Sequence, residues 1–180
     1  MQIKNLFFAL ALAWTAGASL ASEPLTTVPA LDVPRYMGTW YEIAKFPNWF
    51  QRKCMGNTRA QYSLLANGQV QVLNRCKLAS GETDQATGAA RQIGAANSPQ
   101  LKVRFAPAWL SFIPVVWGDY WVIELDDNYQ WVAVSEPGRE YLWILSRSPR
   151  MEPKLYADLL ARLSRKGLDV QKLELSSQEN

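Results

Sequence analysis

The sequence predicts an all-β fold: an eight-stranded antiparallel up-and-down β-barrel with a C-terminal α-helix packed on its outside. Up to residue 148, short segments rich in β-branched and aromatic residues alternate with turn residues, which is typical of a sandwich or a barrel. The connections are short, so consecutive segments should pair as antiparallel neighbours. Closing such a sheet into a barrel removes its unpaired edges.

Turn chemistry separates the expected strands. Asn67-Gly68 is a strong signal for a tight hairpin, and residues 126–128 and 137–139 mark two more tight turns. The strands expected between these turns are Thr39–Phe46, Thr58–Leu65, Gln69–Cys76, Thr87–Ile93, Gln100–Phe105, Tyr120–Asp126, Gln130–Glu136 and Tyr141–Arg147.

One helix is expected after the last strand. Pro153 suits a first helical position and Gly167 suits a C-terminal stop. Val170–Leu175 is a candidate for a short extra strand. The leucines of the helix recur at helical spacing, and they make one apolar stripe that can lie against the barrel: Leu155, Leu159, Leu160 and Leu163.

Residues 1–21 have the three-part pattern of a secretory signal, with Lys4 before the apolar run Leu6–Trp14 and small residues before a cleavage point after Ala21. A buried N-terminal helix is the alternative. Residues 22–180 are then expected to form a single domain. The leader pattern predicts an exported protein, periplasmic or secreted. No cysteine stands at the expected cleavage point, so we expect that the protein is not lipid-anchored by its own sequence; association with the outer membrane stays open.

Cys54 and Cys76 are the two cysteines of the chain. In an exported protein an even pair favours a disulfide over two free thiols. A hairpin centred on Asn67-Gly68 would place Arg59, and not Cys54, opposite Cys76. We therefore expect the segment 51–57 to fold back on itself so that the disulfide can form.

The composition excludes several kinds of chemistry. The chain has no histidine, which excludes histidine-based acid–base catalysis, Ser-His triads and histidine-ligated zinc. No glycine-rich phosphate loop is present, and Glu42 with Glu124 is the one carboxylate pair that strand parity could bring to one cleft. The net charge of +3 is small and scattered, so nucleic acid is not an expected partner. We expect no catalytic activity, no metal and no cofactor.

The first and last strands are expected to lie side by side and to close one end of the barrel. The Trp40 indole can then stack under the Arg147 guanidinium, next to Gly38. Such a cation–π contact contributes about 0.5–2 kcal/mol. A barrel plugged at one end is a cup that can hold one small apolar ligand.

Strand alternation predicts which side chains line this cup. The aromatic residues expected on the inward face carry O–H or N–H groups that would need hydrogen-bond partners in a filled core. Packing in a filled core is nevertheless the alternative for each one of them. Glu42 is expected to bond Tyr62 or a ligand head group, or else to lie wet at the rim. The expected lining residues are Glu42, Ala44, Phe46, Ala60, Tyr62, Phe105, Tyr120, Val122 and Trp143.

Three motifs in order carry a family resemblance. They are Gly38-x-Trp40-Tyr41, Gly118–Ile123 and Tyr141–Arg147. With them, the chain from Leu31 to Leu175 resembles the lipocalins, in particular the bacterial outer-membrane lipocalins and their relative apolipoprotein D. Many bacterial members carry a lipidation cysteine at the end of the signal, which this chain lacks.

The resemblance implies a calyx that binds a fatty acid, a lysophospholipid or a similar amphiphile and that serves membrane-lipid storage or maintenance. It implies that Tyr62, Tyr120 and Trp143 are pocket aromatics, whereas Gly38, Trp40 and Arg147 form the structural plug. Two alternatives stay open: an enzyme that uses the same calyx to act on a lipid or isoprenoid, and a protein-interaction barrel whose core is filled.

The segment Ala106–Trp117 is the longest apolar stretch outside the leader, and its two prolines prevent one regular strand. Such a loop is rarely left in water without a reason. It could fold over the core, form a homodimer contact, or form a lid or lip of the pocket that makes a transient membrane contact through Trp109, Leu110 and Phe112.

Overall fold

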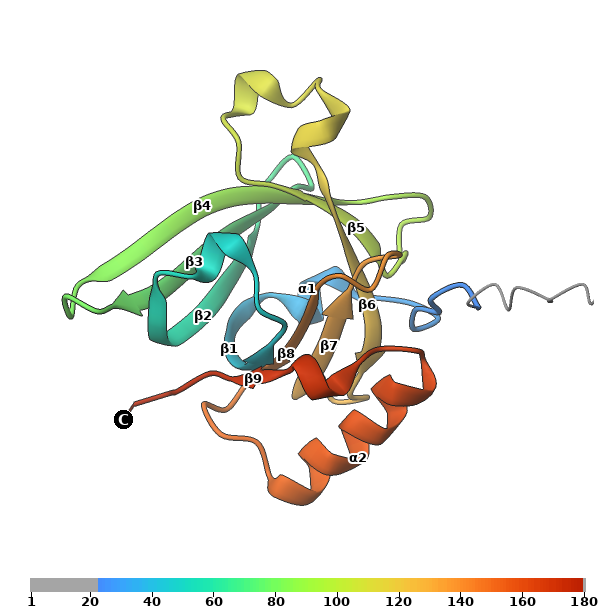
Figure 1. The fold of residues 1–180 in the computed structure, drawn as a ribbon. Coiled ribbons are helices and arrows are strands. Elements are labelled where there is room, and N and C mark those ends of the chain that lie inside the picture. The colour runs from blue at the N-terminus through green and yellow to red at the C-terminus, as the bar shows by residue number, and fades with distance from the viewer. Residues whose placement is uncertain (1–22, 180) are drawn as a thin grey trace, which may run out of the picture.

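The computed structural model describes residues 23–179, in which nine strands form one antiparallel sheet (Figure 1). The order is β2-β3-β4-β5-β6-β7-β8-β1-β9, and an additional pairing of β2 with β1 closes the first eight strands into a barrel. The strands are β1 (Gly38–Lys45), β2 (Cys54–Leu64), β3 (Val70–Leu78), β4 (Thr83–Gln92), β5 (Gln100–Arg104), β6 (Gly118–Leu125), β7 (Trp131–Ser135), β8 (Leu142–Ser146) and β9 (Glu174–Leu175).

The predicted eight-stranded barrel and its C-terminal helix are confirmed, and β9 is one more strand outside the barrel. The expected leader, residues 1–21, lies outside the described residues. Two strands begin a full four residues earlier than predicted, β2 at Cys54 and β4 at Thr83. The first residues of β4 are mostly exposed and polar, so they lack the alternation that marks a half-buried strand; their pairing with β3 extends the strand instead.

The β2–β3 hairpin differs from the prediction by one residue. Its loop runs over Leu65–Gln69, with Gly68 N–H bonded to Leu65 C=O at 2.9 Å and Gly68 at φ +79°. A left-handed residue at the end of a turn gives a longer loop than a two-residue hairpin. Arg59 therefore pairs with Arg75, and not with Cys76 as expected.

The Cys54–Cys76 disulfide is present. Of the segment 51–57 that was expected to fold back, residues 54–57 instead belong to strand β2, in which Cys54 lies opposite Leu78 of β3. Two register shifts between Cys54 and Arg59 absorb the extra residues. The disulfide thus crosses a bulged part of the β2–β3 ladder.

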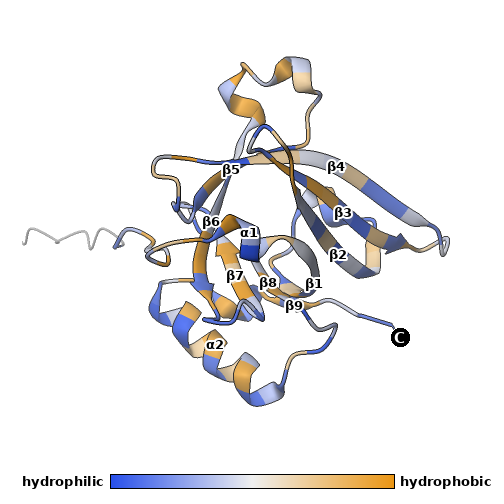
Figure 2. Ribbon diagram, turned by 180° about the vertical axis from the view of Figure 1, so that it is seen from behind, coloured by the Kyte–Doolittle hydropathy of each residue, from blue (hydrophilic) through white to orange (hydrophobic). Residues whose placement is uncertain are grey.

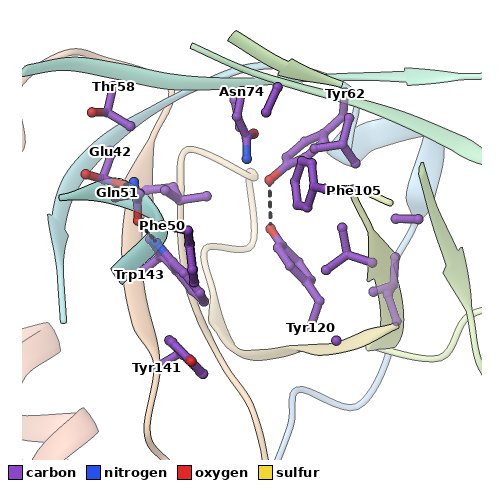
Figure 3. Close-up of a pocket in the computed structure, with 18 of the residues that line it drawn as sticks. Glu42, Phe50, Gln51, Thr58, Tyr62, Asn74, Phe105, Tyr120, Tyr141 and Trp143 are labelled. Atoms are coloured by element: carbon purple, nitrogen blue, oxygen red, sulfur yellow. Dashed lines mark hydrogen bonds between the residues drawn. The ribbon is translucent and has the colours of Figure 1, made fainter. Parts of the chain in front are cut away.

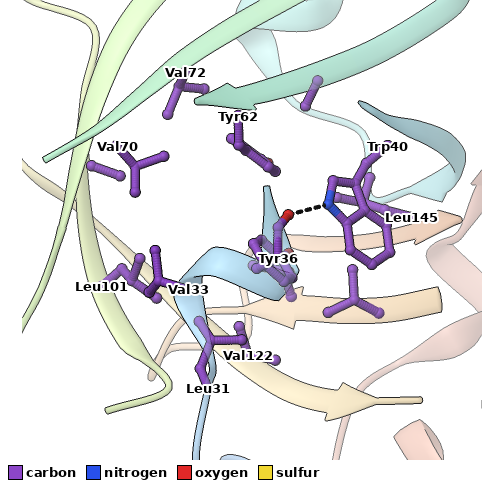
Figure 4. Close-up of a cluster of buried hydrophobic side chains, with 14 of the residues drawn as sticks. Leu31, Val33, Tyr36, Trp40, Tyr62, Val70, Val72, Leu101, Val122 and Leu145 are labelled. Atoms are coloured by element: carbon purple, nitrogen blue, oxygen red, sulfur yellow. Dashed lines mark hydrogen bonds between the residues drawn. The ribbon is translucent and has the colours of Figure 1, made fainter. Parts of the chain in front are cut away.

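Two clusters of buried apolar side chains lie on the two sides of the barrel wall. The inner cluster fills the closed end, where helix α1 (Val33–Tyr36) crosses the floor and places the Tyr36 ring 5.0 Å from the Trp40 ring (Figure 4). This short helix was not expected from the sequence. Asp32 caps its N-terminus by accepting a hydrogen bond from the Arg35 N–H.

The outer cluster lies between the barrel and helix α2 (Pro153–Arg165). Leu159 and Leu163 are fully buried there, and apolar and polar residues alternate along α2 as its expected stripe requires (Figure 2). Glu152 caps the helix by accepting from two backbone N–H groups. No helix among residues 23–179 has the length and hydropathy needed to cross a lipid bilayer.

The apolar segment between β5 and β6 forms two short 3-10 turns, Ala108–Leu110 and Pro114–Val116, and it projects beyond the barrel (yellow in Figure 1). Trp117 at its end is buried, whereas Trp109 is 72% exposed and Phe112 is 77% exposed. Only the end of this segment therefore folds over the core.

Candidate functional site

A cavity of about 830 Å³ occupies the barrel above the inner cluster. Its walls come from the inward faces of the strands, and its mouth is formed by the segments that follow β1, β5 and β7. Trp49 and Val115 line this mouth and are 70% and 87% exposed. The cavity therefore opens to solvent at this end of the barrel.

The opposite end is closed by Trp40 and Arg147. The Arg147 guanidinium carbon lies 3.9 Å from the centre of the Trp40 ring, and the guanidinium donates to the carbonyl oxygens of Thr39, Arg35 and Tyr129. Trp40 is fully buried and its indole N–H donates to the Tyr36 carbonyl at 2.8 Å (Figure 4). Gly38 has φ +98°, and a Cβ there would lie 3.2 Å from Arg147 Nη1, so this position suits glycine alone.

Three tyrosine hydroxyls meet at the depth of the cavity. The Tyr120 hydroxyl lies 2.7 Å from that of Tyr36 and 3.1 Å from that of Tyr62 (the second contact is drawn in Figure 3). Burial raises the pKa of all three hydroxyls well above the usual tyrosine value, so they stay protonated. Three O–H groups share two hydrogen bonds, so one proton is left to donate to an acceptor oxygen in the cavity.

A second polar cluster lies on the opposite wall, around Glu42 (Figure 3). The Gln51 amide donates to Glu42 Oε2 at 2.7 Å, and its oxygen accepts from the Trp143 indole N–H at 3.0 Å. Ser176 Oγ donates to Glu42 Oε1 at 2.5 Å. Glu42 is only 3% exposed, so it does not lie wet at the rim. Its carboxylate oxygens bond Gln51 and Ser176, whereas the Tyr62 hydroxyl bonds Tyr120.

Burial raises the pKa of the Glu42 carboxyl above its usual value, and the hydrogen bonds from Ser176 and Gln51 oppose this shift in part. As pH rises from the ordinary glutamate pKa through the raised pKa, the folded protein holds a proton that the unfolded chain has released. Stability contributed by Glu42 is therefore complete below that window and is lost across it.

We expect the Glu42→Gln variant to lack this loss, because the amide keeps the shape of the carboxyl without its charge. The free energy of unfolding of the variant, relative to that of the unchanged protein, should rise between pH 3.5 and pH 8. Urea unfolding at both pH values measures this difference. A difference that is the same at both values would contradict the assignment.

The structure places six of the nine expected lining residues on the cavity and three elsewhere. Ala44 and Phe46 belong to the outer cluster under α2, because the pairing of β1 with β8 shifts register between Glu42 and Ala44 and reverses the alternation. Val122 is fully buried in the inner cluster at the closed end. The six residues on the cavity are Glu42, Ala60, Tyr62, Phe105, Tyr120 and Trp143.

Glu124, the other half of the carboxylate pair, does not face the cavity. It lies under α2, 3.4 Å from Lys166 and 3.8 Å from Arg162. The pairing of Glu42 with Glu124 in one cleft is thus wrong. The β6–β7 ladder shifts register between Val122 and Glu124, which reverses the parity on which the pairing depended.

Several polar lining residues were not expected from the sequence. Thr58 and Asn74 share the parity of Tyr62 and Val72 on their strands, so alternation alone could have found them. Asn74 Oδ1 is buried without a hydrogen-bond partner among the described residues. Gln51 lies in the 3-10 turn Trp49–Gln51 after β1, where no periodic pattern indicates a direction.

A barrel sealed at one end, with a large aromatic cavity open at the other, defines a protein of the small-molecule-binding β-barrel class. The model of the lipocalin-like domain family matches residues 31–178. The chain belongs to the lipocalin family, whose members bind small hydrophobic ligands.

Relatives from distant organisms are similar over most of the chain. Temperature-induced lipocalin-1 of Arabidopsis thaliana is 40% identical over 88% of this chain and 85% of its own length. Outer membrane lipoprotein Blc of Escherichia coli (strain K12) is 39% identical over 82% and 80%, and mouse apolipoprotein D is 33% identical over 83% and 78%. Insecticyanin from the tobacco hornworm shares the fold, with a TM-score of 0.67 at 20% identity over 87% of this chain and 85% of that one.

Proposed function

We propose that the protein binds one amphiphilic lipid, a fatty acid or lysophospholipid, in the barrel cavity and carries it for membrane-lipid storage or maintenance. The observation that carries this proposal is the cavity of about 830 Å³, which is within the usual range for a small-molecule pocket. Its walls include Val70, Val72 and Leu101, which suit an acyl chain. A cavity of this size also disfavours a protein-interaction barrel with a filled core.

The polar groups of the cavity support an amphiphile over a pure hydrocarbon. The surplus proton of the tyrosine cluster can donate to a ligand oxygen, and the free Asn74 Oδ1 can accept from a ligand hydroxyl. Buried polar groups are stabilised when a ligand satisfies them. We place the carrier outside the cytoplasm as an exported single-domain protein, because the chain combines a leader pattern with a disulfide.

Titration with a fluorescent fatty-acid analogue tests the proposed binding. Trp143 lines the cavity, so a bound analogue should quench its emission in a saturable way. The Trp143→Phe variant is the matched control: it should still bind the analogue, but the quenching should be smaller. A chain that binds no analogue would contradict the proposal, and recovery of a chemically altered lipid after long incubation would favour an enzyme.

The exposed side chains of the β5–β6 segment suit a carrier that collects lipid from a bilayer. Trp109 and Phe112 lie at the cavity-mouth end of the barrel and are largely exposed. Aromatic side chains of this kind partition into the membrane interface. We expect the Trp109→Ser/Phe112→Ser variant to pick up lipid from vesicles several times more slowly than the unchanged protein.

The control for this variant is Leu64→Ser/Leu65→Ser, because these two exposed leucines lie at the β2–β3 hairpin, at the closed end. Vesicle pick-up by the control should be unchanged. Equal pick-up rates for all three proteins would rule out the proposed membrane contact. A loss of dimers in the loop variant, measured by sedimentation, would assign the segment to a homodimer contact instead.

A further inference from the structure

Strands β1 and β2 close the barrel, but they pair with each other along only part of their length. The two strands pair from Gly38 with Tyr62 to Tyr41 with Arg59, and no further pair follows. Beyond this point β2 continues along β3 with two register shifts. The seam is therefore open, as far as strand pairing goes, along the half of the barrel that holds the cavity.

The C-terminal segment 174–179 occupies this open seam, where its red ribbon passes β1 (Figure 1). On one side β9 pairs with Ala44 and Lys45, and Ser176 N–H donates to the Ile43 carbonyl at 2.9 Å. On the other side Asn57 N–H donates to the Ser177 carbonyl at 2.8 Å. The segment thus bonds to both strands.

Gln178 bridges the seam at the rung where the ladder ends. Its Nε2 donates to the carbonyl oxygens of Glu42 and Thr58, each at 2.8 Å. Glu42 and Thr58 line the cavity from β1 and β2, and Ser176 Oγ also holds the Glu42 carboxyl. The C-terminal segment is therefore in direct contact with the cavity wall.

The attachment of this segment depends on hydrogen bonds and exposed ion pairs, and little on apolar burial. Leu175 is 73% exposed. The carboxylates of Glu174 and Glu179, paired with Lys45 and Lys77, are 58% and 60% exposed, and exposed ion pairs stabilise little. Segments with few buried apolar contacts open locally at low free energy.

We propose that segment 174–179 is a side latch of the cavity, which keeps a bound lipid in place while it is docked and opens a route through the barrel wall when it is released. The proposal rests on lipid binding in the cavity. The latch makes the rate of ligand release depend on a segment that is not itself part of the cavity lining.

Gly56 offers a way to displace the latch without changing it. A Cβ at Gly56 would lie 2.9 Å from the Ser177 carbonyl oxygen and 3.3 Å from Ser177 Cβ. The Gly56→Ala variant therefore cannot keep the docked position of the segment unless backbone moves. Gln178→Ala is the milder change, and Gln171→Ala, at an exposed glutamine of the preceding 3-10 turn, is its matched control.

The experiment measures dissociation of a fluorescent fatty-acid analogue by stopped flow. It uses the full chain, a chain ending at Leu173, Gly56→Ala, and the two changes combined. We expect release to be about tenfold faster in the truncated chain and in Gly56→Ala, given the hydrogen bonds that are lost. Gln178→Ala should speed release several-fold, and Gln171→Ala should not.

The combined variant separates a latch from general loosening of the barrel. If Gly56→Ala acts through the segment, it should add nothing in the truncated chain. Unchanged release in the truncated chain and in Gln178→Ala, with binding retained, would overturn the latch and leave the proposed function standing. Absence of binding in the full chain would overturn both.

Discussion

Replacing Trp40 with alanine is expected to lower the free energy of unfolding by about 3–5 kcal/mol, the usual cost of truncating a large buried aromatic side chain. Trp40 is fully buried, and it supports Arg147 at 3.9 Å. Its loss would leave a void in the floor and would leave the Tyr36 carbonyl without the indole donor. The guanidinium that ties Arg35, Thr39 and Tyr129 together would lose its stacking surface.

The matched control is Trp109→Ala, which removes the same side chain from a position that is 72% exposed. Its effect should stay within about 0.5 kcal/mol, as for most surface changes. Urea unfolding followed by far-UV circular dichroism measures both variants. If the two variants lost equal stability, Trp40 would not be the closing element of the barrel floor.

Replacing Ala86 with tryptophan is expected to weaken lipid binding by about 10–100-fold, because overpacking and lost ligand contacts each cost on the order of 1–3 kcal/mol. Ala86 lines the cavity and yet is exposed, so its methyl group faces open space inside the barrel. It pairs with Asn74, the residue with a free acceptor. An indole at this position would occupy the volume that we assign to the ligand.

Thr87→Trp is the control, because Thr87 is the next residue of β4, is exposed, and is not part of the cavity lining. This variant shows how a tryptophan on the same strand affects binding when its side chain points away from the cavity. The analogue should bind to Thr87→Trp as it binds to the unchanged chain. Equal affinities of the Ala86 and Thr87 variants would mean that the ligand binds outside the barrel.

How well the sequence predicted each cavity residue depends on whether the strand around that residue is regular. Tyr62, Tyr120 and Trp143 lie on regular parts of their strands, so their side chains keep the alternation and face the cavity. Ala44 lies just past a bulge, so one extra residue in β1 sends its side chain to the other face. Gln51, in the irregular turn after β1, comes to the wall only through its contacts with Glu42 and Trp143.

By itself, the sequence determined the order of the strands and the C-terminal helix, because alternation, helical spacing and turn residues act over a few neighbouring positions. The disulfide partners followed from the chain having two cysteines. It also indicated the pair Trp40 and Arg147. Only the tertiary structure decided where the β1 bulge falls, how far β2 extends and that residues 174–179 lie in the β1–β2 seam. These features depend on contacts between residues far apart in the chain, such as Gln178 with Glu42 and Thr58, which no local pattern encodes.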